Sequence, residues 1–147
     1  MSLLYADTSA LVRAYFADEV DHSLLNRRLL QGTDPVVTSE LARVELASAV
    51  AAAARGGRLR RPRIVLDRFD ADCADDGPLA LLRLDPLPIL ERAHTLVLEH
   101  PLRTLDAIHL AVALGDASEL AAGEPVIFVT RDQVQAEAAR ALGLETA

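Results

Sequence analysis

Four acidic residues of this chain stand where a carboxylate needs an explanation. Two follow short apolar runs of the kind that form buried strands, and two lie on segments with helical periodicity. They are Asp7, Glu45, Asp106 and Asp132. Acids that are distant in sequence but meet in space are what a hard, oxygen-preferring cation requires. We therefore interpret these four as the catalytic and metal-binding residues of a divalent-metal phosphodiesterase site.

Asp7 and Glu45 each have a structural alternative. Asp7 ends the apolar run 3–6, at the carboxyl end of a predicted strand, where open α/β sheets bind their ligands. It would equally serve as the N-cap of a helix that begins at Thr8. Glu45 lies on the apolar side of a predicted helix, where an unpaired charge is costly. It therefore needs a metal ion, a proton or an arginine such as Arg43.

The other two acids have alternatives of the same kind. Thr104 is the expected N-cap of a helix whose first turn holds Asp106, and the helix dipole favours a negative charge there. His109 follows on the same face and is interpreted as a core histidine rather than a ligand, because Mg²⁺ prefers oxygen. Thr130 and Gln133 match a capping box, which explains a helix start beside the last acid. The joint occurrence of all four acids favours the metal site.

The elements that must position these residues alternate between strand and helix, as in parallel β/α units. Strands are expected at 3–6, 36–38, 81–84 and 126–129, with a short fifth near 142–145, and helices at about 8–16, 20–31, 39–55, 62–75, 87–99, 104–115 and 132–142. The strands lack strict alternation, which predicts that both faces of the sheet are covered. We expect one domain over residues 1–147, with an α/β fold and a mostly parallel sheet of four to five strands.

Composition excludes several classes of protein. No run approaches the roughly 18 apolar residues of a membrane span, and the first residues do not resemble a signal peptide. A single cysteine, Cys73, permits neither an internal disulfide nor a zinc cluster, which suits a reducing cytosol. All fifteen basic residues are arginine, so chemistry that needs a lysine, as in P-loop nucleotidases, is excluded. We expect a cytoplasmic protein with no membrane partner.

The segments that carry the four acids resemble the PIN-domain nucleases and, more narrowly, the VapC toxins of bacterial toxin–antitoxin pairs. These segments are LYADTSAL (residues 4–11), SELARVEL (39–46), LDAIHLA (105–111) and VTRD (129–132), followed by AARALGL (138–144). None is specific alone, but together they stand in the family's order and spacing, and the likeness spans nearly the whole chain.

The resemblance implies a fold, an activity and partners. The fold is a three-layer α/β/α sandwich, and the activity is internal cleavage of RNA with Mg²⁺ or Mn²⁺. Position by position, Asp7, Glu45, Asp106 and Asp132 match the family's acidic quartet, and Thr8, Ser9 and Thr130 match its supporting hydroxyls. The resemblance also implies a homodimer that a small VapB-like antitoxin silences.

RNA must still approach a chain whose net charge is −7. One short stretch holds five arginines that could contact phosphates: Arg55, Arg58, Arg60, Arg61 and Arg63. The cluster is equally consistent with a solvated turn or a docking surface for a partner. With only two tyrosines, three phenylalanines and no tryptophan, broad base-stacking platforms are not expected.

Two other functions fit the same residues. The first is a catalytically idle PIN-like module that binds RNA or an antitoxin, although the presence of Glu45 and Asp106 argues against it. The second is a metal-dependent DNA nuclease or phosphatase. No sequence feature separates RNA from DNA, because recognition of the 2′-hydroxyl leaves no readable motif here.

Overall fold

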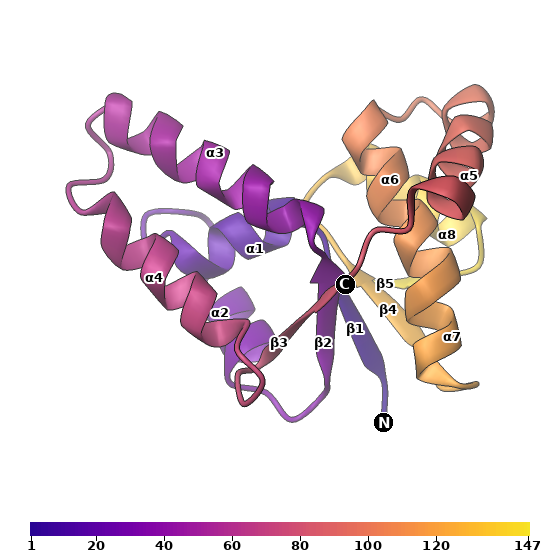
Figure 1. Cartoon of the computed structure of the whole chain (residues 1–147), viewed down its shortest axis with the longest axis horizontal. Helices are drawn as coiled ribbons and strands as arrows, with labels where there is room; N and C mark the ends of the chain where they lie inside the picture. The colour runs from indigo at the N-terminus through magenta and orange to yellow at the C-terminus, as the bar shows by residue number, and fades with distance from the viewer.

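Five parallel strands form the centre of the protein in a computed structural model that describes all 147 residues (Figure 1). The strands are β1 (Leu3–Ala6), β2 (Val36–Ser39), β3 (Leu79–Leu82), β4 (Val126–Val129) and β5 (Glu145–Thr146), in the order β3–β2–β1–β4–β5. Every neighbouring pair is parallel. The sheet grows outward from β1 in both directions, so its topological switch point lies between β1 and β4. Open α/β sheets bind ligands at this point.

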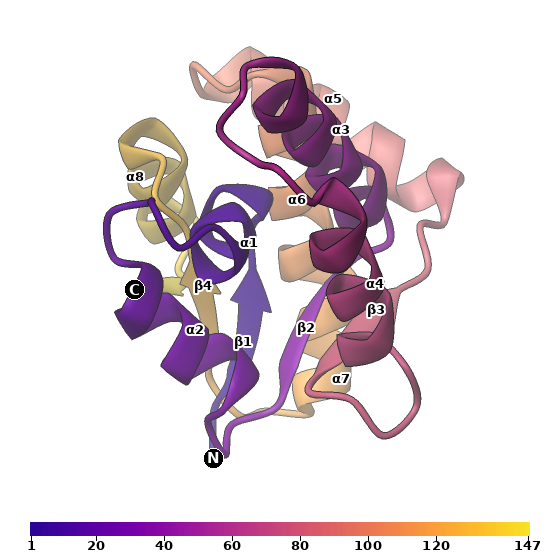
Figure 2. The same ribbon diagram turned by 90° about the vertical axis from the view of Figure 1, so that its left-hand side faces the viewer.

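Helices cover both faces of the sheet. One side holds α1 (Thr8–Tyr15), α2 (His22–Leu30), α3 (Leu41–Arg55) and α4 (Pro62–Asp72), and the other holds α5 (Pro86–Glu99), α6 (Thr104–Val112), the π-helical segment η1 (Ala113–Ala117), α7 (Ser118–Ala121) and α8 (Gln133–Ala141). Figure 2 shows the first group in front of β1 and β2, with α5, α6 and α7 behind. The predicted three-layer α/β/α sandwich is confirmed. None of the helices combines the length and apolar character needed to cross a lipid bilayer.

The two faces of β1 build two separate cores, because successive side chains of a strand point in opposite directions. Leu4 and Ala6 pack in the core under α1–α4, whereas Leu3 and Tyr5 pack in the core under α5–α8. All four are buried, as a central parallel strand requires. Tyr5 also stacks on Phe128 of β4 with ring centroids 5.4 Å apart. This contact ties together the two strands that flank the switch point.

Several predicted elements differ from the structure. The fifth strand, expected near 142–145, lies at Glu145–Thr146, and the helix expected at about 62–75 ends at Asp72. The strand expected at 81–84 lies two residues earlier, at β3. It ends there because the backbone N–H of Leu84 donates to Glu40 Oε1 at 2.8 Å instead of to the sheet. The helix expected at 104–115 is divided into α6, η1 and α7. The buried alanines of η1 pack against β1 and β4, and a π-helical turn accommodates this close approach.

Candidate metal centre

Asp7 stands directly after β1 with 3% of its surface exposed. Its Oδ2 accepts hydrogen bonds from the Ser9 hydroxyl at 2.6 Å and from the Thr130 hydroxyl at 3.2 Å. Its Oδ1 accepts from Gln135 Nε2 at 3.2 Å. Asp7 also caps α1, since Oδ2 accepts from the backbone N–H of Ser9 at 3.2 Å. The helix cap and the predicted site residue are therefore one side chain, fixed by donors on three elements.

Glu45 extends from α3 toward a chain of buried hydrogen bonds. Its Oε1 accepts from the Thr8 hydroxyl at 2.9 Å and lies 2.5 Å from His109 Nε2. His109 is fully buried, and its Nδ1 lies 2.7 Å from the Tyr5 hydroxyl. The Ser39 N–H donates to the Tyr5 oxygen at 3.2 Å. In the neutral ring Tyr5 can donate to Nδ1 while the Nε2–H donates to Glu45; in the protonated ring both nitrogens donate, Nδ1–H to the Tyr5 oxygen and Nε2–H to Glu45.

His109 and Glu45 change each other's protonation. Burial alone would lower the pKa of His109, but the hydrogen bond to Glu45 and the charge of Asp7 outweigh it, so the pKa is raised. Burial alone would raise the pKa of Glu45, but the hydrogen bond and charge of His109 outweigh it, so that pKa is lowered. Both shifts favour an ion pair. The alternative partner Arg43 is not used, because it pairs with Asp70 at 3.1 Å.

Asp106 and Asp132 share the guanidinium of Arg103. Arg103 Nε lies 3.0 Å from Asp106 Oδ2, and Arg103 Nη2 lies 3.2 Å from Asp132 Oδ2. Asp132 uses its other oxygen to cap α8, accepting from the Gln135 backbone N–H at 3.1 Å. Burial, with help from the charges of Asp7 and Asp132, raises the pKa of Asp106 despite the neighbouring arginine. The acids are therefore close enough to repel one another.

Gln135 connects Asp7 with the segment that carries Asp106. Its Nε2 donates both to Asp7 Oδ1 at 3.2 Å and to the Asp106 carbonyl oxygen at 3.3 Å. His109 Nε2 also lies 3.9 Å from Asp7 Oδ1. All four predicted acids thus belong to one continuous set of contacts at the switch point. The three predicted hydroxyls also reach acids: Thr8 bonds Glu45, and Ser9 and Thr130 bond Asp7.

In this arrangement no three His, Cys, Asp or Glu side chains meet as ligands of one ion. Protein donors contact most of the carboxylate oxygens of the four acids. The residues nevertheless fit a hard divalent cation, because they supply several carboxylates and Asp106 Oδ1 accepts no hydrogen bond from the protein. A hollow of about 400 Å³ opens beside them, lined by Glu45, Arg103, Thr104, Leu105 and Asp106.

Two expected helix caps are wrong. Thr104 is the first residue of α6 rather than its N-cap, and Arg103 occupies the cap position without a side-chain hydrogen bond. The Thr130–Gln133 capping box does not form, because Asp132 caps α8. Thr130 instead accepts from the Asp132 N–H at 3.1 Å, and its hydroxyl lies within donating distance of Gln135 Oε1 at 3.0 Å and of Asp7 Oδ2 at 3.2 Å. The hydroxyl of Thr130 thereby connects the start of α8 with Asp7.

The sequence does not predict that Arg103 and Gln135 belong to the network, and it predicts the role of His109 only in part. Arg103 stands three residues before Asp106, the spacing of a pair on one helix face, which was the available signal. Gln135 gave no signal, since its burial depends on how α8 packs. His109 was predicted as a core histidine, and it is one, but it also contacts Glu45.

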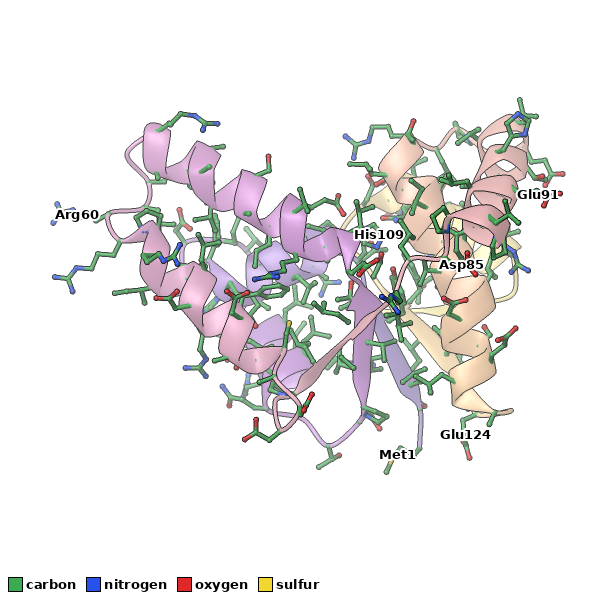
Figure 3. The ribbon with its side chains drawn as sticks, in the orientation of Figure 1. Met1, Arg60, Asp85, Glu91, His109 and Glu124 are labelled. Atoms are coloured by element: carbon green, nitrogen blue, oxygen red, sulfur yellow. The ribbon has the colours of Figure 1, made fainter.

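The arginine cluster lies away from the acids, at the outer end of the α3–α4 hairpin. Figure 3 shows Arg60 at that end and His109 near the middle of the molecule. Arg58 bonds two acids of the α1–α2 connection, Asp18 at 2.9 Å and Glu19 at 3.0 Å. The structure therefore does not bring the cluster to the predicted metal centre.

Comparison with known proteins agrees with this fold. Residues 4–141 match the family described as PIN domain. Ribonuclease VapC47 of Mycobacterium tuberculosis (strain CDC 1551 / Oshkosh) is 35% identical, with 99% of this chain and 96% of the relative aligned. Ribonuclease VapC46 of Mycobacterium tuberculosis (strain ATCC 25618 / H37Rv) is 33% identical, over 98% and 95%. The chain belongs to the PIN-domain family and is a VapC-type member of it.

Solved structures share the fold at low sequence identity. VapBC2 from Rickettsia felis, bound to a DNA fragment from its promoter, is 14% identical with a TM-score of 0.65 and coverage of 99% and 97% of the two chains. Mycobacterium tuberculosis VapC20, described as a sarcin–ricin loop cleaving toxin, is 18% identical with a TM-score of 0.65 over 96% and 95%. FitAcB from Neisseria gonorrhoeae is 17% identical with a TM-score of 0.63 over 99% and 96%.

Proposed function

We propose that this protein is a divalent-metal-dependent endoribonuclease that hydrolyses RNA phosphodiester bonds and acts as the toxin of a VapBC-type pair. The observation that carries the proposal is the single network of Asp7, Glu45, Asp106 and Asp132 at the switch point between β1 and β4. The names of the relatives support the substrate, since both are ribonucleases. VapC20, which has the same fold, is described as a toxin that cleaves the sarcin–ricin loop.

In this proposal the four acids hold Mg²⁺ or Mn²⁺. When bound, such an ion supplies a Lewis acid for the phosphate and lowers the pKa of water. The chain itself supplies preorganisation. Ser9, Thr130 and Gln135 hold Asp7 in one orientation before any ligand arrives, so its oxygens need no rearrangement.

Glu45 is the candidate proton acceptor for an attacking water. Thr8 and His109 both contact its Oε1, which leaves Oε2 without a hydrogen bond from the protein. The hydrogen bond and charge of His109 lower its pKa, which keeps the carboxylate ionised and able to accept a proton but makes it a weaker base. Glu45 also lines the hollow beside Asp106, where a phosphodiester could approach.

RNA would reach this site along arginine-bearing surfaces. Because Arg58 is engaged with Asp18 and Glu19, Arg60 and Arg61 are the better candidates for phosphate contacts within the cluster. Their distance from the acids means that they would bind a flanking part of the RNA, or a partner, rather than the scissile phosphate.

The proposed partners are a VapB-like antitoxin and a second copy of the chain, in the cytoplasm. Support comes from the structural neighbours, which include VapBC2, FitAcB and a toxin–antitoxin complex from Klebsiella pneumoniae that is 19% identical with a TM-score of 0.56. Exposed apolar residues such as Leu87, Leu90 and Leu98 on α5 provide surface that such a contact would bury.

The test compares purified wild-type protein with Asp7→Asn and Asp106→Asn on an RNA and a DNA of the same sequence, in Mg²⁺, Mn²⁺ or EDTA. Asp67→Asn is a matched control, because it neutralises an exposed acid on α4. Cleavage of RNA that needs the divalent ion and is lost in both site variants, but not in Asp67→Asn, would support the proposal. Equal cleavage of the DNA would instead favour a general nuclease.

Melting temperature gives a second measurement that does not depend on finding the right RNA. An ion that binds only the folded protein must stabilise it by mass action. Millimolar Mg²⁺ or Mn²⁺ should raise the melting temperature of the wild type and of Asp67→Asn, but hardly that of Asp106→Asn. Full cleavage in EDTA would contradict metal dependence, and binding of RNA without any cleavage would favour the idle binding module.

A further inference from the structure

Arg103 connects two acids that belong to different elements. Asp106 lies in the first turn of α6, and Asp132 stands at the start of α8. One guanidinium reaches both, with Nε at 3.0 Å from the first and Nη2 at 3.2 Å from the second. The neighbouring Arg131 does not share this role, since it pairs with Asp21 at 3.0 Å. Arg103 is thus the one arginine that neutralises this pair.

The oxygens that Arg103 occupies are those that a cation would need. Asp132 commits its Oδ1 to the cap of α8, which leaves Oδ2, and Arg103 holds Oδ2. Arg103 also holds Asp106 Oδ2, so only Oδ1 of that carboxylate is unengaged. A carboxylate oxygen can accept a second partner, but a divalent ion on either shared oxygen would lie against the positive guanidinium. Binding of the ion to both acids therefore favours withdrawal of at least one arm of the guanidinium.

The contacts of Arg103 with Asp106 and Asp132 should break easily. Its side chain is 81% exposed, whereas those of Asp106 and Asp132 are 17% and 25% exposed. Ion pairs made by so exposed a side chain are weak and are screened by salt. No hydrogen bond other than those to the two acids holds the guanidinium. The fold fixes Asp106 and Asp132, whereas Arg103 reaches them through a long and exposed side chain.

We propose that Arg103 is a built-in counterion that competes with the divalent ion for Asp106 and Asp132. It neutralises the acid pair when the ion is absent and withdraws when the ion binds. Arg103 thereby sets how much free divalent ion the site requires. This inference rests on the proposed function only in assuming that these acids bind a divalent ion.

The test measures Mn²⁺ binding without RNA, by calorimetry and by the electron paramagnetic resonance signal of free Mn²⁺. Arg103→Gln should bind Mn²⁺ about two- to fivefold more tightly than the wild type, the range expected from losing exposed ion pairs. Arg103→Lys, which keeps the charge but not the two-armed geometry, should lie between them. Arg131→Gln removes an equal charge nearby without touching the acid pair, and should leave the affinity closer to that of the wild type.

The sign of the effect separates the inference from a structural role. If Arg103 served to assemble the acids, Arg103→Gln would bind Mn²⁺ more weakly, and either weaker or unchanged binding overturns the inference. An equal gain in Arg131→Gln also overturns it, because general electrostatics would then suffice. Absence of Mn²⁺ binding in all four proteins would overturn the proposed metal centre itself. Without ion, Arg103→Gln should melt at a lower temperature than the wild type, because the acid pair loses its counterion.

Discussion

His109 Nε2 lies 2.5 Å from Glu45 Oε1, and this contact places a buried imidazole beside a group of carboxylates. The ring is fully buried, and its other nitrogen lies 2.7 Å from the Tyr5 hydroxyl. His109 therefore links the core of the sheet to a residue of the site. The pKa of His109 is raised, which favours the protonated ring, and its positive charge offsets part of the negative charge of the neighbouring acids.

Removing this imidazole should destabilise the fold. His109→Leu leaves the Tyr5 hydroxyl and part of the Glu45 carboxylate without a partner, which should cost about 2–4 kcal/mol in free energy of unfolding. Tyr5→Phe removes only the hydroxyl and should cost about 1 kcal/mol. Urea unfolding of both variants and of the double variant gives the coupling between the two residues. Additive effects would contradict a direct hydrogen bond.

The free energy of unfolding should depend on which group replaces the amide of Gln135. Gln135→Leu deprives Asp7 Oδ1 of its donor and should lower the free energy of unfolding by about 1–3 kcal/mol. Gln135→Glu places a second carboxylate against Asp7 and should be worse at pH 7, but should recover part of its stability near pH 4, where a glutamate protonates. Urea midpoints at the two pH values test this order. Equal losses at both would show that charge near Asp7 does not matter.

Within the arginine cluster, Arg58 should contribute more to the stability of the fold than Arg60 and Arg61. Arg58 bonds Asp18 and Glu19 and lies over the Phe16 ring, 5.5 Å from its centroid. Arg58→Ser should therefore lower the melting temperature, and Arg60→Ser should not.

The salt dependence of RNA affinity tests whether the arginine cluster contacts RNA. If Arg60 and Arg61 contact phosphates, their joint replacement by serine should reduce the slope of log affinity against log salt by about 1.4 to 1.8. Binding is measured with Asp7→Asn as the common background, so that RNA stays intact. An unchanged slope would assign the cluster to a partner surface or a solvated turn.

Cys73 should react slowly while the protein is folded. Burial, with the charges of Asp72 and Asp70, raises the pKa of its thiol to about 11. At pH 8 only about one thiol in a thousand is then ionised, and the thiolate is the reactive form. Iodoacetamide labelling should accelerate about tenfold per pH unit between pH 8 and 10. The urea-unfolded chain should react much faster at pH 8, and similar rates in both states would contradict the shift.

The shifted pKa of Cys73 also predicts a change in stability with a definite sign. The folded state retains a proton that the unfolded thiol loses first, so stability falls as pH rises from the ordinary value toward about 11. Cys73→Ala should remove this part of the alkaline loss.

Much of the fold could be predicted because β1 and β4 are short apolar runs with clear ends. Both strands match the expected residues, 3–6 and 126–129. The strand at β3 was placed two residues late, because Leu79–Leu84 is apolar enough to pair in either register. The bond from Leu84 to Glu40 that ends the strand is a tertiary contact. The π-helical turn of η1 likewise depends on close packing against the sheet, which periodicity does not reveal.

The four acids of the site could be predicted because each is unusual in its local setting. Their partners could not. Gln135 and His109 are ordinary residues for the helices that carry them, and only the packing of α8 and α6 brings them to Asp7 and Glu45. The four acids predict a positive charge between them in the form of a metal ion. In the structure, the guanidinium of Arg103 supplies a positive charge to two of them, Asp106 and Asp132.

The acids of the network come from four separate stretches of the chain, and the last, Asp132, follows the fourth strand of the fold. A fragment that ends before Asp132 lacks one of the four acids, so the nascent chain on a ribosome does not contain the complete centre until that residue has been added. For a protein proposed to cut RNA, assembly from distant segments withholds the complete set of acids until Asp132 has been synthesised.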